Sequence, residues 1–330
     1  MELNDLENNF KNYLSKWING IEDEIYFWHS IISNDEKWNS FVDNRKVQSN
    51  LNINKNSIKI LDVGSGPMTI CSPSEDKYII SCDPLADYYE LLMKLFNRTP
   101  IVQPVFCFSE RLYERFESNF FDKVFMRNAI DHSFFPMNTI FNLLYTVKIG
   151  NKVILRHAEN EALRENYQGF HQFNIDIIDN DPILWNQSTN INIKELIKDI
   201  AIVNSNKEFV IDRNFINIEL IKIKDFNILD YIHNNYYFDK YIFLELSQFV
   251  SNHAISLYNK LYNESKFIEY KKFDKFNNFD TNKLRMEGKL ESNNKLIDSM
   301  AWWIPIKKLR NNFRNKFTIR PDQTRPDHKL

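Results

Sequence analysis

The apolar positions near the start of the chain repeat with the spacing of an α-helix. Between residues 6 and 21, the apolar side chains fall on one helical face. They are Leu6, Phe10, Tyr13, Leu14, Trp17, Ile18 and Ile21. A second helix is predicted through Ile25, Trp28, Ile31 and Ile32, followed by a polar, Asn-rich connector that ends at Lys55. We therefore expect an N-terminal helical cap over residues 1–55.

From residue 58 onward, short apolar runs alternate with helical stretches. The predicted strands are 58–63, 78–82, 102–108, 122–126 and 152–156, and the predicted helices are 85–96 and 139–147. This alternation is typical of a parallel sheet with helices on both faces. Two more runs, 208–211 and 216–223, predict a β-hairpin because only the link Asp212-Arg213-Asn214 separates them. The fold class is therefore α/β, with a Rossmann-like sheet of parallel strands closed by a C-terminal hairpin over residues 56–225.

The last third of the sequence is helical and then polar. A core face between 246 and 261 predicts a helical extension over residues 226–300, of which 263–295 are polar and irregular. Residues 301–330 form a predicted basic amphipathic tail, with Trp302-Trp303 before a helix that carries no acid between 301 and 320. Such a helix favours contact with a membrane surface. Packing on this or another subunit is the alternative.

Composition and charge exclude some classes of function but do not indicate a particular one. The formal net charge is -2, which gives no global attraction to nucleic acid, so no nucleic-acid partner is expected. Cys71, Cys82 and Cys107 form no CxxC pair, and the polar N-terminus does not resemble a signal peptide. No apolar run approaches the roughly 18 residues that cross a bilayer. We expect a cytoplasmic protein, peripheral at the inner face of the membrane if the tail binds lipid.

The first predicted strand leads directly into the turn Asp62-Val63-Gly64-Ser65-Gly66-Pro67. Glycines at such a turn allow the backbone to approach a ligand, although an ordinary tight turn has the same pattern. Thr69 stands where a dinucleotide-binding motif has its third glycine, which disfavours NAD. Asp83 ends the second strand, where a carboxylate can accept both ribose hydroxyls. A ligand with one ribose and no phosphate fits this pair best.

Several segments resemble a family of bacterial class I S-adenosylmethionine (SAM)-dependent methyltransferases that is associated with surface-polysaccharide genes. The resemblance spans roughly residues 20–225, and its segments are 24–28, 61–69, 82–89, 121–136 and 156–176. The sheet closed by a hairpin is also the class I methyltransferase layout. The resemblance implies SAM as the cofactor and methyl transfer as the reaction.

The resemblance also implies a role for each residue of the cofactor site. Asp62, Gly64, Ser65 and Gly66 would line the methionine moiety, and Asp83 would hold the ribose. Pro84 and Leu85 would flank the adenine, and Ser109 and Glu110 would border it. Arg127 and Asn128 would close the floor of the pocket. One departure concerns the stretch between Val63 and Tyr78, which is short and contains Pro67 and Pro73, so its helix is predicted to be a single turn.

Polar residues cluster after the fourth and fifth strands, at the edge where parallel strands face a ligand. Histidine suits the removal of a proton from an oxygen acceptor near neutral pH. His132 is the predicted base, with Asp131 orienting it or binding the acceptor. His157 and His171 are further candidates, and Tyr167 and Gln172 could fold over the site. No metal is expected, although the histidines with Glu159 and Glu161 also permit a divalent ion.

The predicted function is methyl transfer to a hydroxyl, or a phosphate-type oxygen, on a sugar of a bacterial surface polysaccharide or its precursor. Methylation of a small metabolite or a nucleotide-linked precursor is the first alternative. A non-catalytic subunit of a glycan-assembly complex is the second. Trp17 and Trp28 could either cover the cofactor or belong to the core.

Overall fold

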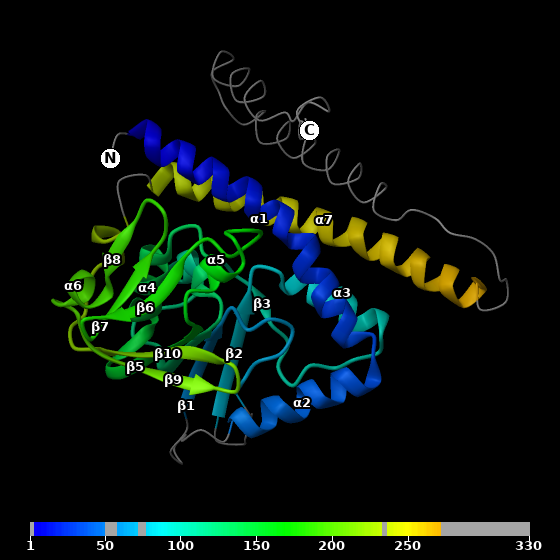
Figure 1. Cartoon of the computed structure of the whole chain (residues 1–330), viewed down its shortest axis with the longest axis horizontal. Coiled ribbons are helices and arrows are strands. Elements are labelled where there is room, and N and C mark those ends of the chain that lie inside the picture. Colours follow the sequence, from blue (N-terminus) through cyan, green and yellow to red (C-terminus); the bar gives the residue numbers. More distant parts are fainter. Residues whose placement is uncertain (1–2, 50–57, 72–76, 233–235, 272–330) are drawn as a thin grey trace, which may run out of the picture. The chain divides into compact units, whose positions relative to one another are not determined.

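The computed structural model describes residues 3–49, 58–71, 77–232 and 236–271 (Figure 1). It divides into two units, Met1–Asn259 and Lys260–Leu330, and the sheets lie in the first unit. The predicted tail 301–330 and residues 272–295 of the predicted irregular segment lie outside the described residues. The contact of the tail with a membrane therefore stays a prediction.

The predicted sheet is confirmed, with the strand order β3-β2-β1-β4-β5-β10-β9. The strands are β1 (Ile58–Val63), β2 (Lys77–Asp83), β3 (Val105–Phe106), β4 (Phe121–Arg127), β5 (Val147–Ala158), β9 (Ala201–Val210) and β10 (Arg213–Lys222). Strands β1 to β5 pair in parallel, and β10 runs antiparallel to both β5 and β9. This is a Rossmann-like sheet of parallel strands that is closed by a C-terminal hairpin.

The register places the ends of the central strands side by side. Val63 of β1 pairs with Cys82 of β2 on one side and with Met126 of β4 on the other, and Met126 pairs with Leu155 of β5. All four side chains are buried, and as register partners they share one face of the sheet, so this face lies within the core. The loops that follow β1, β2, β4 and β5 consequently meet at one edge of the sheet.

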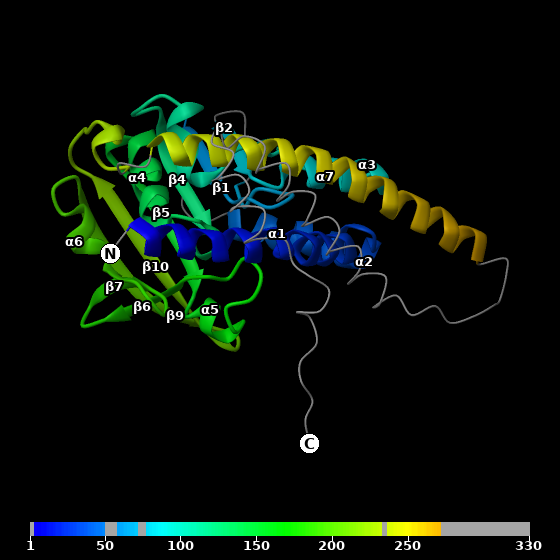
Figure 2. The ribbon, with the colours of Figure 1, turned by 90° about the horizontal axis from the view of Figure 1, so that it is seen from above.

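The longer helices of the described residues are α1 (Leu3–Ile32), α2 (Asp35–Ser49), α3 (Ala86–Leu95), α4 (Pro136–Thr146) and α7 (Tyr236–Lys271). Figures 1 and 2 show α1 and the first part of α7 running across the same side of the sheet. Trp17 of α1 lies 5.3 Å from Phe134, and Phe243 of α7 lies 4.9 Å from Phe108, between ring centroids. Among the described residues, no helix is both long enough and apolar enough to cross a membrane.

Four local predictions are wrong. The two predicted N-terminal helices are one continuous helix, α1, and the predicted polar connector contains α2. Apolar side chains do not gather on one face of α2, which is why periodicity does not reveal it. The third strand is reduced to Val105–Phe106. Residues 263–271, predicted to be irregular, belong to α7. Residues 64–71 form turns and bends, and the rest of the stretch in which a single helical turn was predicted lies outside the described residues up to Lys77.

A second, three-stranded sheet was not predicted. Its strands are β6 (Asn174–Ile178), β7 (Asp181–Trp185) and β8 (Asn190–Asn192), and the short helices α5 (Glu161–Arg164) and α6 (Ile193–Ile197) flank it. Asp179 and Asn180, between β6 and β7, both have positive φ angles, 52° and 67°. Asp and Asn at adjacent left-handed positions favour a tight hairpin turn, so the pair Asp179-Asn180 was the signal available in the sequence.

Gly64 permits a close approach between the turn after β1 and the segment after β4. Its φ is +65°, and a Cβ placed on it would lie 2.4 Å from Cβ of Ala129. We predict that Gly64→Ala lowers the free energy of unfolding by about 3 kcal/mol or more, because a left-handed alanine and a steric clash add together. Urea denaturation measures this loss.

Gly150→Ala is the matched control. Gly150 also has a positive φ, +79°, but no atom lies within 4 Å of the position that its Cβ would occupy. The expected loss there is only about 1–2 kcal/mol. Equal losses in the two variants would show that the contact with Ala129 does not constrain the fold.

Candidate active site

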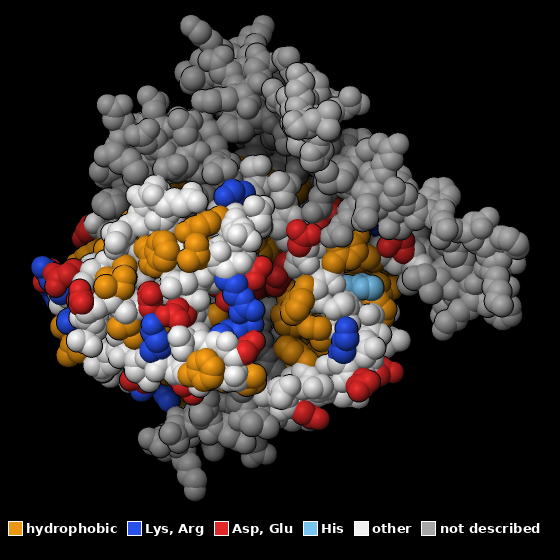
Figure 3. All heavy atoms as spheres, viewed as in Figure 1, with side chains coloured by type: hydrophobic (Ala, Val, Ile, Leu, Met, Phe, Trp, Pro, Cys, Tyr) orange, Lys and Arg blue, Asp and Glu red, His pale blue; other side chains and the backbone are white. Residues whose placement is uncertain are grey.

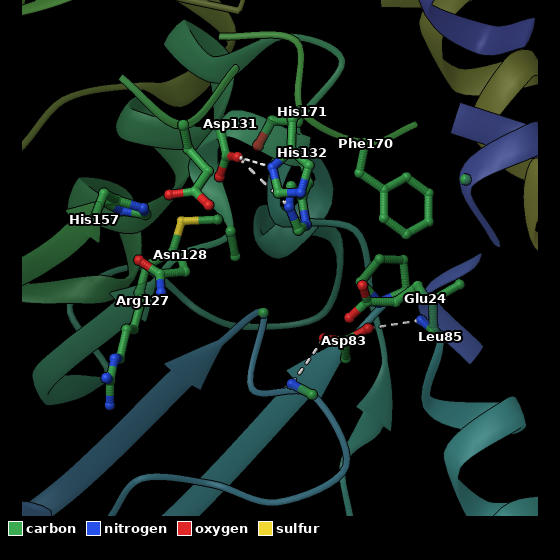
Figure 4. A pocket seen from close by; sticks show the side chains of 18 of the residues that line it. Glu24, Asp83, Leu85, Arg127, Asn128, Asp131, His132, His157, Phe170 and His171 are labelled. Atoms are coloured by element: carbon green, nitrogen blue, oxygen red, sulfur yellow. Dashed lines mark hydrogen bonds and ion pairs between the residues drawn. The ribbon is translucent and has the colours of Figure 1, made fainter. Parts of the chain in front are cut away.

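The turn after β1 and the end of β2 are joined by the carboxylate of Asp83. Its Oδ2 accepts a hydrogen bond from Gly66 N at 3.0 Å, and its Oδ1 accepts one from Leu85 N at 2.8 Å (Figure 4). Each carboxylate oxygen keeps a second lone pair that can accept a hydroxyl. Burial raises the pKa of Asp83 to about 7, and the nearby Glu24 and Asp62 add to this effect.

The carboxylate of Asp62 also stabilises this turn. Its Oδ2 accepts hydrogen bonds from Thr69 Oγ1 at 2.6 Å and from Ile70 N at 2.9 Å, and the residue is buried. Asp62 does not line the cavity described next, in contrast to the predicted contact with the methionine moiety. Thr69, which replaces the third glycine of a dinucleotide motif, therefore closes the loop onto Asp62.

A cavity of about 960 Å³ opens at the edge of the sheet where the strand-end loops meet. With the exception of Asp62, it is lined by every residue that was predicted to bind the cofactor or to act in catalysis: Gly64, Ser65, Gly66, Asp83, Pro84, Leu85, Ser109, Glu110, Arg127, Asn128, Asp131, His132, His157 and His171. Its volume lies near the upper end of the range for small-molecule sites, roughly 300–1,000 Å³. It can therefore hold a cofactor together with an acceptor.

Ser109 and Glu110 line the cavity, but their polar atoms are largely engaged in holding its wall. Glu110 Oε1 accepts from Phe134 N at 2.7 Å, and Ser109 Oγ lies 2.9 Å from Thr139 Oγ1. Burial raises the pKa of Glu110. These contacts hold the loop after β4 in place. That Ser109 and Glu110 border the adenine stays a prediction.

Arg127 is the last residue of β4, Asn128 follows it, and both line the cavity. Asn128 takes a positive φ of 46°, and its Oδ1 accepts a hydrogen bond from Ala158 N at 3.0 Å, which ties the ends of β4 and β5 together. Burial lowers the pKa of Arg127, and the adjacent charge of Arg156 lowers it further. Figure 4 shows the Arg127 side chain extending away from the histidines.

Asp131, His132 and His171 come together across the cavity from Asp83 (Figure 4). His171 Nδ1 lies 2.7 Å from Asp131 Oδ2, and His132 Nε2 lies 3.5 Å from the same oxygen. Burial opposes ionisation of Asp131, but the two histidines outweigh it and lower its pKa to about 2. Burial also opposes protonation of His171, yet the hydrogen bond with Asp131 raises the pKa of His171.

This geometry changes the ranking of the candidate bases. His132 was the predicted base, but burial lowers its pKa, and its Nε2 has no hydrogen-bond partner among the described residues. His171 instead forms a close pair with a buried carboxylate, which is the arrangement that orients a general base. His171 is therefore the better candidate for proton removal.

His157 lies at the end of β5 and also faces the cavity. Only 3% of the residue is exposed, and neither ring nitrogen has a hydrogen-bond partner among the described residues. Burial lowers its pKa to about 4, so the ring is neutral at physiological pH. Two unpaired nitrogens beside a cavity suit the hydrogen bonds of a polar ligand.

Helix α1 completes the cavity with residues whose roles the sequence analysis left open. Trp17 and Trp28 are both buried and both line the cavity, so they are core residues, and a role in covering the cofactor stays a prediction. Glu24, which accepts a hydrogen bond from Trp28 Nε1 at 2.8 Å, faces Asp83 and was missed as a site residue. Its position four residues before Trp28 on one helical face was the available signal.

The loop after α5 connects the acid–base cluster to α1. Gln172 N donates to Asp131 O at 3.1 Å, and Lys16 Nζ donates to Gln172 Oε1 at 3.1 Å. Gly169, with a φ of +54°, packs against Gly20 of α1. Tyr167 and Gln172, predicted to fold over the site, do not line the cavity, whereas their neighbours Phe170 and His171 do.

Comparison with known proteins gives structural similarity alone, since no protein family and no curated protein matches the sequence. A SAM-dependent methyltransferase from Aquifex aeolicus is 14% identical, with a TM-score of 0.36, over 54% of this chain and 89% of that chain. The PH0226 protein from Pyrococcus horikoshii is 15% identical, with a TM-score of 0.35, over 57% of this chain and 93% of that chain.

Phosphoethanolamine N-methyltransferase 2 from Haemonchus contortus, solved with SAM, is 13% identical, with a TM-score of 0.38, over 55% of this chain and 53% of that chain. Similarities this low assign neither a family nor a substrate to the chain. The strand order and the cavity define the class of fold by themselves: a Rossmann-like α/β protein with a ligand site at the carboxyl ends of its central parallel strands.

The lowered pKa of Asp131 predicts a pH-dependent contribution to stability. A carboxylate whose folded-state pKa of about 2 lies below its usual 3.8 stabilises the fold above pH 3.8, and this effect is lost as the pH falls toward 2. We expect Asp131→Asn to cost about 2 kcal/mol of unfolding free energy at pH 7. Urea denaturation from pH 7 to pH 3 should show the cost shrinking below about pH 4.

Asp199→Asn is the control, because Asp199 is exposed. It should leave stability unchanged over the same pH range. A cost for Asp131→Asn that stays constant from pH 7 to pH 3 would contradict the assigned charge of Asp131.

Proposed function

We propose that the chain is a SAM-dependent O-methyltransferase. The observation that carries the proposal is one cavity that joins a ribose-binding carboxylate, Asp83, to an acid–base pair, Asp131 and His171. The glycine turn lines the same cavity, at the carboxyl ends of β1 and β2, where ligands bind in open parallel sheets. The resemblance of residues 20–225 to class I methyltransferases supports the same cofactor.

The reaction needs little covalent chemistry from the protein. An acceptor oxygen attacks the methyl carbon of SAM, the carbon–sulfur bond breaks, and its electron pair stays on sulfur, which yields S-adenosylhomocysteine. The acceptor proton passes to His171, whose ring Asp131 orients. Alignment of oxygen, methyl and sulfur in line supplies most of the acceleration, since the cavity holds both substrates in one place.

The acceptor in this proposal is a sugar, or a phosphate-type group on a sugar, of a bacterial surface polysaccharide or its precursor. The acceptor side of the cavity is polar, with unpaired nitrogens on His157 and with Glu161 and Arg213 in its lining. On the face in Figure 3, acidic and basic side chains gather beside apolar ones near the centre. A hydroxyl-rich acceptor suits such a mixed lining.

Cofactor affinity should depend on the ionisation of Asp83. The carboxylate form accepts ribose hydroxyls, whereas the protonated form has lost an acceptor, and the pKa of the free protein is about 7. We expect the affinity for S-adenosylhomocysteine to fall by up to about tenfold per pH unit below pH 7 and to level off above pH 8. Isothermal titration calorimetry from pH 5.5 to pH 8.5 measures the profile.

Asp83→Asn should bind S-adenosylhomocysteine about 10–100-fold more weakly at pH 8, because hydrogen bonds to a charged acceptor are lost. Its affinity should also no longer vary between pH 6 and pH 8. If the Asp83→Asn variant kept the wild-type affinity for S-adenosylhomocysteine, or the wild-type pH profile, Asp83 would not bind the cofactor.

Methyl transfer is tested with methyl-labelled SAM. The purified chain is incubated with nucleotide-sugars and, separately, with polysaccharide fractions, and label in the acceptor is counted. We expect His171→Ala to lower kcat by about 100-fold or more while the affinity for S-adenosylhomocysteine is unchanged. His29→Ala, on α1 against Phe96, should leave both unchanged. Absence of label in every acceptor despite cofactor binding would refute catalysis of sugar methylation.

A further inference from the structure

Asp131, His132 and His171 present three metal-ligating atoms to the acceptor side of the cavity. One ligand atom of each residue lies within 4.8 Å of the others. We propose that this cluster binds a divalent first-row transition ion of the zinc class. The proposal goes beyond methyl transfer, and the binding of the ion does not depend on that function.

The distances suit a shared ion. Ligand atoms that each lie about 2.1 Å from one metal, at octahedral or tetrahedral positions, are about 3.0–3.5 Å apart. Asp131 Oδ2 lies 2.7 Å from His171 Nδ1 and 3.5 Å from His132 Nε2, so small side-chain rotations suffice. In the ion-bound chain, the metal takes the place of the proton that Asp131 and His171 share.

A second observation points to a missing ligand. His132 Nε2 is a buried nitrogen without a hydrogen-bond partner among the described residues, although the ring packs between Phe170 and His171. Buried polar atoms are rarely left unpaired, because desolvation without a partner costs about 1–3 kcal/mol. A metal ion at the usual zinc–histidine distance from this nitrogen, roughly 2.0–2.1 Å, would satisfy it.

The chemical types of the three ligands indicate which ions the cluster prefers. Two imidazoles and one carboxylate favour Zn²⁺, Mn²⁺, Fe²⁺, Co²⁺ or Ni²⁺, whereas Mg²⁺ and Ca²⁺ prefer oxygen ligands. Three protein ligands also leave coordination positions open, as in catalytic metal sites. All three residues line the cavity, so the open positions face the acceptor. Glu161 and Glu165, which also line the cavity, add negative charge that favours a cation.

The ion would act on the acceptor, and this role rests on the proposed function. An acceptor hydroxyl or phosphate oxygen bound to the ion loses its proton more readily, because the metal stabilises the anion. The cluster would thereby favour an acceptor whose oxygen becomes an anionic ligand when it loses its proton.

Cobalt binding tests the site without reference to activity. The full chain, free of any polyhistidine tag and treated with chelator, is titrated with Co²⁺ and followed by its visible absorption. We expect one equivalent to bind and Zn²⁺ to displace it, while Mg²⁺ leaves the spectrum unchanged. His132→Ala and His171→Ala should each weaken binding by at least about tenfold, since even outer-sphere partners of a metal site contribute that much.

His157→Gln is the matched control, because His157 lies in the same cavity but outside the cluster, and it should bind Co²⁺ as the wild type does. X-ray absorption of the Zn²⁺-loaded wild type needs no variant and should show two imidazole ligands. No Co²⁺ binding, binding unchanged in both alanine variants, or a zinc site without imidazoles would overturn the proposal. Binding of S-adenosylhomocysteine to the same samples is measured separately, so failure of the metal site is distinguishable from failure of the cofactor site.

Discussion

The close approach of Gly64 to Ala129 is the constraint on which the site depends. It places the turn after β1 against the segment after β4, where a side chain on Gly64 would meet Cβ of Ala129 at 2.4 Å. Asp131 follows Ala129 by two residues, and Gly66 follows Gly64 by two. The cofactor turn and the acid–base cluster consequently face the same cavity from adjacent strands, and a small backbone shift at this contact would move both.

Two buried carboxylates then acquire opposite properties from their surroundings. Burial raises the pKa of Asp83 to about 7 and nearby Glu24 adds to the rise, although the hydrogen bonds that Asp83 accepts from backbone N–H groups oppose it. Asp131 lies against His132 and His171, so favourable charges dominate and lower its pKa to about 2. Divergent pKa values of this kind separate roles within one site. The proposed roles follow this difference: Asp83 would accept hydroxyls, and Asp131 would support a base or a cation.

The sequence predicted the parts of this molecule that local chemistry determines. The alternation of apolar runs predicted the parallel strands. The residues predicted for cofactor binding and catalysis, except Asp62, all line the cavity, whereas most of the lining from helix α1 and from the loop after α5 was not predicted. Periodicity could not reveal α2, whose apolar residues lack a common face, and the turn at Asp179-Asn180 was overlooked as a hairpin signal. The pairing of Asp131 with His171, 40 residues apart, depends on where the loop after α5 folds back, which sequence spacing does not encode. Asp62 was placed in the cofactor site by resemblance, whereas the structure uses it to close the turn.

A crystal structure of the chain with S-adenosylhomocysteine tests the central claim most directly. The account predicts ribose hydroxyls within hydrogen-bond distance of Asp83, with the sulfur directed across the cavity toward Asp131 and His171. S-adenosylhomocysteine bound elsewhere, or with its sulfur directed away from this pair, would contradict the account.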